Sequence, residues 1–360
     1  MILKERTVPL VIKKLDALLR RLPSDHPQWS RIEEDLFKYK AGYQGEKSLD
    51  YHLSFFPKER SFILHDVRLV DDFQHFFQID TIIITPRVLI IIEVKNLIGT
   101  LYFDQHFNQL IRSIDGKEES FINPILQVDR QKRQLSQWLR KHNFINLSVI
   151  PYVVVSSPKT IIKASSNQSE IAKKVFHSEL LYKKVEELEL KFKSDFYTHK
   201  EIRRLAKLLI KQHQLLDQNI LDKYNIGNIE LLTGVICTNC HHFSMVRDKG
   251  NWICKNCLHV SKLAHISALV DYFLLIGNSI NNKQVRDFLH IPSIYNASRL
   301  LRKLNLPSSG TTTSCHSNPL FSLIPIPLLL KFHFLRFLKG ILPCVFLCMA
   351  CHFQPKMKLR

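Results

Sequence analysis

The sequence predicts a mixed α/β domain with a small central sheet, followed by a short cysteine-rich segment and a helical segment. Three observations lead to this fold class. Apolar patterns over residues 28–156 follow the order helix, strands, helix, strand. The run VLIIIEVK at 88–95 is almost wholly apolar, which is typical of a strand buried on both faces of a sheet. Two Cys-x-x-Cys pairs then lie beyond residue 236.

The individual elements follow from local patterns. An imperfect apolar stripe predicts a helix over 28–56, and Asn123-Pro124 is a helix-start signal for a second helix that ends near residue 142. Runs rich in β-branched residues predict strands at 61–70, 76–85, 88–95 and 148–156, with a further hairpin at 100–114. Pro86-Arg87 supplies a turn that sets the second and third strands side by side.

The charge balance indicates an anionic partner. The 360 residues include 51 Lys and Arg against 32 Asp and Glu, a formal net charge of +19. Nucleic acid is the common partner of such a chain, although a solvated basic surface is the alternative. The first residues are too charged for a secretory signal, and cysteines spaced in Cys-x-x-Cys pairs suit metal binding in a reducing compartment. We therefore expect a cytoplasmic protein without stable membrane association; protein partners are unknown.

Shifts in composition divide the chain into five segments. We expect an N-terminal leader at 1–27, an α/β domain at 28–217, a cysteine-rich ribbon at 235–260, a helical segment at 265–306 and an atypical tail at 307–360. The tail has no acidic residue and six basic ones, and prolines and basic residues break its apolar runs. None of these runs approaches the roughly 20 residues that a membrane helix needs.

Two of the predicted strands contain acidic or basic residues. Asp80 lies in the second strand, and Glu93 and Lys95 end the third, two residues apart and so on one face. Two carboxylates can hold a hard cation such as Mg²⁺ or Mn²⁺, and a lysine beside them can position water and stabilise charge on a phosphate. The alternative is a surface ion pair between Glu93 and Lys95. Charge directly after a buried apolar run favours the functional interpretation, because burying charge is costly.

An ordered set of short motifs surrounds these residues: Gly45-Glu46, Gln78-Ile79-Asp80, Ile92-Glu93-Val94-Lys95-Asn96 with Gly99, and Asn123-Pro124 with Gln127. Over roughly residues 40–155 this set resembles the nuclease-related domain (NERD) family, which in turn resembles the PD-(D/E)xK nucleases. The resemblance implies a restriction-endonuclease-like mixed sheet flanked by helices, and metal-dependent hydrolysis of phosphodiester bonds in nucleic acid, with DNA the expected substrate.

The resemblance also implies roles for single residues. Asp80 and Glu93 match the metal-binding carboxylates, Lys95 the catalytic lysine, Glu46 the acid of the first helix and Gln127 a glutamine near the site. Without the resemblance, Glu46 could be a helix-surface acid and Gln127 a solvated side chain or a helix-start hydrogen bond. The alternative function is a non-catalytic DNA-binding or scaffold protein with the same fold.

The cysteine pairs predict a structural zinc site. Cys237 and Cys240 precede Cys254 and Cys257 by a stretch that can turn at Asp248-Lys249-Gly250. Four thiolates make a closed tetrahedral Zn²⁺ site of the zinc-ribbon type, although a neighbouring histidine could replace one of them. Beyond it, short helices at about 268–276, 282–289 and 296–304 have the outline of a DNA-binding helix-turn-helix, with a small helical bundle packed on the ribbon as the alternative.

Overall fold

The structure, a computed structural model, describes residues 1–57, 59–165, 168–304, 308–309 and 320–322. The chain divides into two compact units. The first contains residues 1–13 and 30–218, and the second contains residues 14–29 and those from 219 onward. Each unit therefore takes a piece of the N-terminal region as well as a long later segment.

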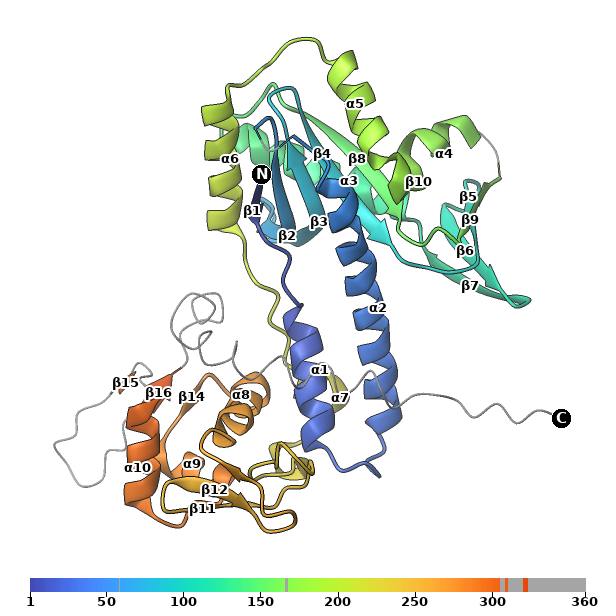
Figure 1. Cartoon of the computed structure of the whole chain (residues 1–360). Coiled ribbons are helices and arrows are strands. Elements are labelled where there is room, and N and C mark those ends of the chain that lie inside the picture. Colours follow the sequence, from blue (N-terminus) through green and yellow to red (C-terminus); the bar gives the residue numbers. More distant parts are fainter. Residues whose placement is uncertain (58, 166–167, 305–307, 310–319, 323–360) are drawn as a thin grey trace. The chain divides into compact units, whose positions relative to one another are not determined.

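A six-stranded mixed sheet forms the centre of the first unit (Figure 1). Its strands lie in the order β1 (Ile2–Lys4), β2 (Phe62–Val70), β3 (Phe76–Ile84), β4 (Val88–Lys95), β8 (Ser148–Val155) and β10 (Val175–His177). The hairpin strands β2, β3 and β4 are antiparallel, whereas β1 joins β2, β8 joins β4 and β10 joins β8 in parallel. The mixed sheet flanked by helices confirms the predicted fold class.

Helices cover both faces of this sheet. On one face, α3 (Pro124–Lys141) and α6 (His199–Gln212) pack against alternate side chains of β2, β3 and β4. On the other face, α2 (Trp29–Leu53) and α5 (Leu181–Lys191) pack against the intervening side chains. Because both faces are covered, β4 is buried along nearly its whole length, as its apolar sequence predicts.

A second, four-stranded sheet adjoins the end of β4. Its order is β7 (Lys117–Ile122), β6 (Gln109–Ile114), β5 (Thr100–Asp104) and β9 (Ile161–Ala164). The predicted hairpin at 100–114 corresponds to β5 and β6. The short helix α4 (Gln168–Lys174) and the 3-10 turn η1 (Ser178–Leu180) complete this unit.

The second unit combines a zinc-ribbon-like sheet with short helices. The ribbon strands are β11 (Met245–Asp248), β12 (Asn251–Cys254) and β13 (Val260–Ser261). The helices are α1 (Leu10–Arg21), which begins in the first unit, α7 (Ile220–Tyr224), η2 (Asn228–Glu230), α8 (His265–Leu275), α9 (Asn282–Leu289) and α10 (Ile294–Lys303). A third small sheet has the order β14 (Ser279–Ile280), β16 (Leu320–Ser322) and β15 (Ser308–Ser309).

The structure of two segments differs from what the sequence predicts for them. Residues 1–27, set apart as a leader, supply β1 to the central sheet and the whole of α1. From the predicted tail at 307–360, two short pieces form β15 and β16, and the rest of the tail lies outside the described residues. No helix in the described part of the chain is long and apolar enough to cross a membrane.

Candidate active site and metal centre

The predicted carboxylates lie where two strands of the central sheet part. The antiparallel ladder between β3 and β4 ends at the pair Thr81 and Ile92. Beyond this pair β3 stays bonded to β2, while β4 continues along β8 as far as Lys95. The Asp80 carboxylate takes the place of a backbone partner, because its Oδ2 accepts the N–H of Val94 at 2.9 Å. The end of the ladder therefore brings Asp80 to the strand that carries Glu93.

Glu93 and Lys95 are joined to helix α3 by side-chain hydrogen bonds. Lys95 Nζ donates to Glu93 Oε1 at 2.7 Å and to Gln127 Oε1 at 3.3 Å. The other Glu93 oxygen accepts from Gln131 Nε2 at 3.3 Å, and the same amide donates to the carbonyl of Gln78 at 2.8 Å. Only 5% of Glu93 is exposed. The predicted residues Glu93, Lys95 and Gln127 are thus directly connected.

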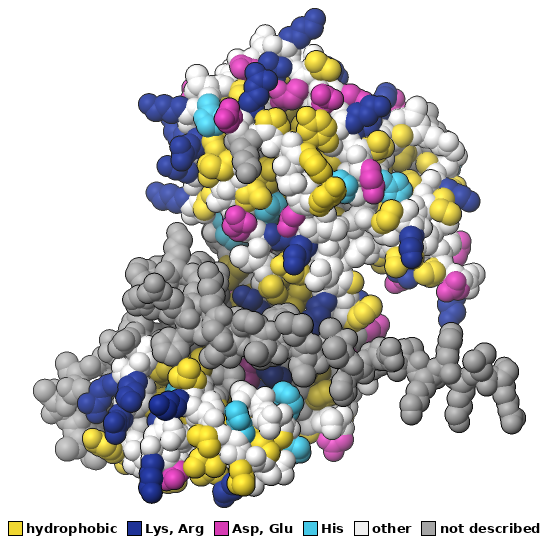
Figure 2. Space-filling view, in the orientation of Figure 1, with side chains coloured by type: hydrophobic (Ala, Val, Ile, Leu, Met, Phe, Trp, Pro, Cys, Tyr) yellow, Lys and Arg dark blue, Asp and Glu magenta, His cyan; other side chains and the backbone are white. Residues whose placement is uncertain are grey.

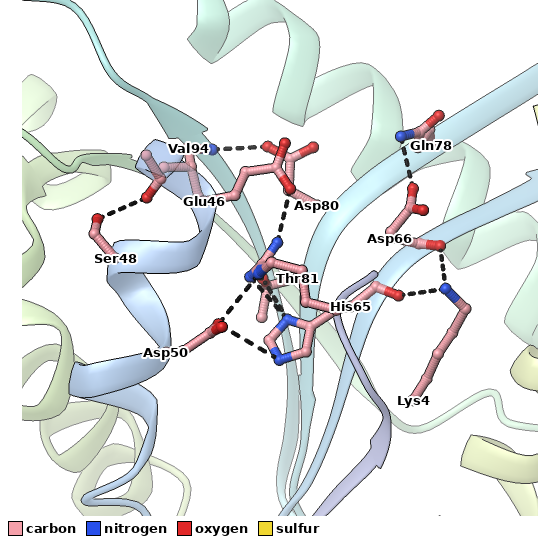
Figure 3. Close-up of polar contacts among 12 residues, drawn as sticks. Lys4, Glu46, Ser48, Asp50, His65, Asp66, Gln78, Asp80, Thr81 and Val94 are labelled. Carbon is pink, nitrogen blue, oxygen red and sulfur yellow. Dashed lines mark hydrogen bonds and ion pairs between the residues drawn. The ribbon is translucent and has the colours of Figure 1, made fainter. Parts of the chain in front are cut away.

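Glu46 approaches the same place from helix α2. Figure 3 shows its carboxylate beside that of Asp80. Arg6 Nη1 donates to Glu46 Oε2 at 2.7 Å, and the same guanidinium contacts Asp50, His65 and Thr81. The Arg6 side chain is only 3% exposed, so this contact network fixes it. Glu46 is linked to the other predicted residues through charge, and Arg6 holds it in position.

Burial and neighbouring negative charges raise the pKa values of two of these carboxylates. Burial raises the pKa of Glu46 to about 7, and the charges of Asp66 and Glu93 add to this, although Arg6 opposes it. Removal from water and the charges of Glu93 and Glu46 raise the pKa of Asp80 well above its usual range, against the hydrogen bond from Val94. Like charges held together away from water are stabilised by a cation, so these carboxylates suit a divalent metal ion.

Three residues of this network were not predicted. Arg6 lies in the segment taken for a leader, and nothing in the local sequence connects it to Glu46. Asp66 follows a regular strand pattern, yet its backbone has φ of +52° opposite the Asp80 region, and its Oδ1 accepts from Gln78 Nε2 at 2.7 Å. Gln131 could have been found, because it lies one helical turn after Gln127 and therefore on the same face of α3.

Gly45 explains how α2 can bring Glu46 so near to the sheet. A Cβ at this position would lie 2.2 Å from Asn96 Cβ and 3.0 Å from Ser156 Oγ. The helix backbone thus passes directly over the end of β4, and the Asn96 amide donates to the carbonyl of Ala41 at 2.8 Å. Only a residue without a side chain permits this approach.

Comparison with known proteins finds a family match over the part of the chain that contains Glu46, Asp80, Glu93, Lys95 and Gln127. Residues 41–156 match the model of the family described as nuclease-related domain. The chain carries a nuclease-related domain. An uncharacterized protein of Bacillus anthracis is 25% identical over 197 residues, which are 55% of this chain and 85% of that protein. No solved structure matches the chain.

The carboxylates of the nuclease-related domain suit a hydrated metal ion. In the described part of the chain, the four cysteines are the one group of three or more ligand side chains whose atoms lie within 4.8 Å of one another. The carboxylates therefore offer a looser set, in which Asp80 and Glu93 are the predicted ligands. Mg²⁺ fits such a set, because it keeps several of its waters and binds to one or two protein carboxylates.

A polar hollow lies beside the nuclease-related site. Its volume is about 410 Å³, and Gln127 and Gln131 form part of its wall. The remaining lining residues come from β3, α3 and the turn before β3: His75, Phe76, Phe77, Gln78, Arg130 and Gln134. Because the two wall glutamines also contact Lys95 and Glu93, a molecule bound in the hollow would lie next to the carboxylates.

The four predicted cysteines converge in the second unit. Their Sγ atoms all lie within 4.8 Å of one another, and two of the pairs, Cys237 with Cys257 and Cys240 with Cys254, are separated by 3.6 and 3.5 Å. A tetrahedron with Zn–S bonds of about 2.3 Å has sulfur atoms about 3.8 Å apart, so the four thiols fit a zinc ion. Four protein ligands leave no position for a substrate, and a zinc ion here would be structural.

Hydrogen bonds around these sulfurs favour thiolates, most clearly at Cys240, whereas burial raises the pKa of Cys237 to about 11. The N–H of Asn239 points at Cys237 Sγ and that of Cys257 at Cys254 Sγ, both at 3.4 Å. The backbone of His242 and the side chain of Asn256 lower the pKa of Cys240 to about 5. Thiolates are the form that binds zinc, so these donors prepare the ribbon for the metal.

Proposed function

We propose that the nuclease-related domain is a metal-dependent nuclease that hydrolyses phosphodiester bonds in DNA. The observation that carries this proposal is the meeting of Asp80, Glu93 and Lys95 at the parting of two strands. Two acidic side chains held close together without an equal number of basic ones are unfavourable unless a cation joins them. The basic balance of the whole chain, +19, suits an anionic polymer as substrate.

Asp80 and Glu93 would hold the metal, with Mg²⁺ or Mn²⁺ as the candidates. A bound divalent cation supplies Lewis-acid polarisation of the phosphate and a more acidic water. Glu46 would complete the acidic wall of the site. Arg6 acts through Glu46, since it fixes the orientation of that carboxylate by the 2.7 Å contact and neutralises part of its charge.

Lys95 is the residue placed to act on the phosphate. Its ammonium group donates to Glu93 and Gln127, and 25% of the Lys95 side chain is exposed, so a substrate can reach it. In this position Lys95 would orient the attacking water and stabilise the negative charge that develops on the phosphate oxygens. Gln127 would hold the ammonium group toward the substrate, and Gln131 would keep Glu93 in one rotamer.

Two observations favour a non-catalytic DNA-binding or scaffold protein instead. The carboxylates are less tightly grouped than the cysteines, and Lys95 is closed in an ion pair with Glu93 at 2.7 Å. A protein that only binds DNA could keep this fold and its basic surface. For either function, the four free thiols of the ribbon suit a reducing compartment, so we place the protein in the cytoplasm.

The test is cleavage by the zinc-loaded full chain. Linear, nicked and single-stranded DNA and RNA are incubated with Mg²⁺, Mn²⁺ or Ca²⁺. Glu93→Gln preserves the shape of the side chain but removes its charge, and Glu186→Ala removes an exposed glutamate of α5 as the matched control. We expect metal-dependent cleavage that Glu93→Gln abolishes and that Lys95→Met reduces by about 10²-fold or more, while Glu186→Ala cleaves normally.

Cleavage that persists in Glu93→Gln would remove this site from the mechanism. Binding of DNA without cleavage under any of the three ions would support the scaffold alternative.

A further inference from the structure

The second unit contains more than the two helices of a helix-turn-helix. Helix α8 is followed by β14, then α9 and α10, and then by β15 and β16. The first strand, β14, pairs with the last, β16, and β15 lies outside β16. This order of three helices and a three-stranded sheet is the topology of a winged helix-turn-helix, in which the last helix faces outward.

Hydrogen bonds within and between α9 and α10 fix the angle between the two helices. Ser293 caps α10 through the N–H of Asn296, and Asn281 caps α9 through the N–H of Gln284. Between the helices, the buried amide of Asn282 donates to the carbonyl of Ile294 and to Ser298 Oγ at 3.0 and 2.8 Å. Helix α10 is therefore held rigidly on α9, as a reading helix must be.

The outer face of α10 is exposed and basic. Ile294 and Tyr295, in its first turn, are 62% and 68% exposed. Arg299, Arg302 and Lys303 follow along the helix and are also exposed, and the helix has no acidic residue. Within the described residues, no ion pair involves these three cations. Figure 2 shows Lys and Arg side chains gathered over this part of the second unit.

Arg247 of the ribbon adds a second cation that has no ion-pair partner among the residues that the structure describes. Its guanidinium stacks over the Trp252 ring, 5.3 Å from the ring centre, and its buried Nη1 has no hydrogen-bond partner within the described part of the chain. Burial, and then the nearby charge of Arg299, lower its pKa. Two arginine charges close enough to affect each other are stabilised by an anion, and a guanidinium is well shaped for phosphate.

Ribbon and helices form one rigid surface. A single core contains the ribbon residues Trp252 and Cys254 together with Val285, Leu289 and Leu300 of α9 and α10. The spacing of Arg247 and Arg299 is therefore set by the fold of the second unit, and it does not depend on how the two units are arranged.

We propose that the second unit binds double-stranded DNA, with the exposed face of α10 in the major groove and Arg247 and Arg299 on the phosphate backbone. This inference deepens the proposed action on DNA, because it names the duplex as the form recognised and α10 as the reading element. An α-helix fits the major groove, and the exposed Tyr295 and Asn296 near its N-terminus are positioned to meet base edges.

The test measures binding in a background that cannot cut. Full-length, zinc-loaded Glu93→Gln protein is titrated into fluorescein-labelled DNA of 30 base pairs, its single strand and a matching RNA duplex, from 50 to 300 mM NaCl. We expect the DNA duplex to be preferred. Arg247→Ala and Arg299→Ala should each reduce the slope of log Kd against log salt by about 0.9, and Tyr295→Ala should weaken binding about 5- to 150-fold.

Lys183→Ala, which removes an exposed lysine of α5 in the first unit, is the matched control and should leave duplex affinity unchanged. Zinc content and helical circular dichroism show that each variant is folded. An unchanged salt slope in the folded Arg247→Ala, Arg299→Ala double variant would overturn the proposal, as would equal affinity for single-stranded DNA or for RNA. Because Glu93→Gln is the background throughout, a protein that never cleaves DNA can still pass this test, and an active nuclease can fail it.

Discussion

Gly45→Ala adds one methyl group at the contact between α2 and the end of β4. The new Cβ would start 2.2 Å from Asn96 Cβ and 2.8 Å from Asn96 Cγ. Carbon atoms in ordinary contact are about 3.5 Å apart, so helix and strand must separate by roughly 1 Å. The next residue along the helix is Glu46. The substitution therefore moves a carboxylate of the candidate site without changing any polar group.

The chain offers a matched control three residues earlier. Gly42 lies on the same helix, and a Cβ there would meet nothing within 4 Å. Gly42→Ala should raise the free energy of unfolding by about 1 kcal/mol, because alanine favours a helix over glycine by that amount. Gly45→Ala has the same gain but also an overpacking cost of about 1–3 kcal/mol. The two variants should therefore differ by about 1–3 kcal/mol, with Gly45→Ala the less stable.

The assays are urea unfolding and metal-dependent cleavage. A misplacement of about 1 Å in a catalytic group can cost about 10²-fold in rate, so cleavage by Gly45→Ala should fall about 10²-fold under conditions where the protein is folded. Adding Asn96→Gly removes the opposing Cβ, and the double variant should recover part of the lost stability as a coupling energy. Equal stability and activity of the Gly42→Ala and Gly45→Ala proteins would refute the close approach that we describe.

Three further predictions concern other parts of the chain. Asp271→Asn removes the carboxylate that lies 3.0 Å from the buried Arg21 guanidinium, which should lower the free energy of unfolding by about 3–5 kcal/mol. Amide hydrogen exchange in α8 should therefore accelerate, and an acceleration below tenfold would contradict this. Removal of zinc with a chelator should unfold the ribbon, seen as a red shift of the buried Trp252 fluorescence, and unchanged emission would argue against a structural ion. Burial lowers the pKa of His65 to about 3, so the unfolded chain binds a proton below pH 6.5 that the folded protein does not. Stability should then fall with decreasing pH more steeply than in His65→Gln, by up to about 1.4 kcal/mol per unit between pH 6 and 4, and parallel urea-unfolding curves for the two proteins would exclude this.

The sequence predicted the elements whose pattern is local. Residues 88–95 were expected as a buried strand and form β4 with the same bounds, because an apolar run of this length fits only the middle of a covered sheet. Asn123 was expected to begin a helix and accepts the N–H of Ile125 as its N-cap. The two cysteine pairs converge because each pair and the turn between them are set by nearby residues.

The elements and contacts that the sequence did not predict depend on residues that are far apart in the chain. Strand β1 has three residues and no recognisable period, and it exists because β2 offers an open edge. Arg6 reaches Glu46 across 40 positions of sequence, and no local pattern records such a pair. Likewise, β14 and β15 are two residues each, so only their pairing with β16 identifies them as strands.

The arrangement at Asp80 shows why a nuclease-like site suits a place where strands part. Within a regular ladder, the N–H of Val94 would be bonded to a neighbouring backbone carbonyl. Where β3 and β4 separate, that N–H lacks a backbone partner, and the Asp80 carboxylate accepts it at 2.9 Å. Glu93 stays buried beside it because β8 still supports β4 from the other side. The same loss of pairing thus gives Asp80 its orientation and brings it to Glu93. For this reason we expect substitutions that extend the β3–β4 ladder to disturb the candidate site more than equally large changes elsewhere in the sheet.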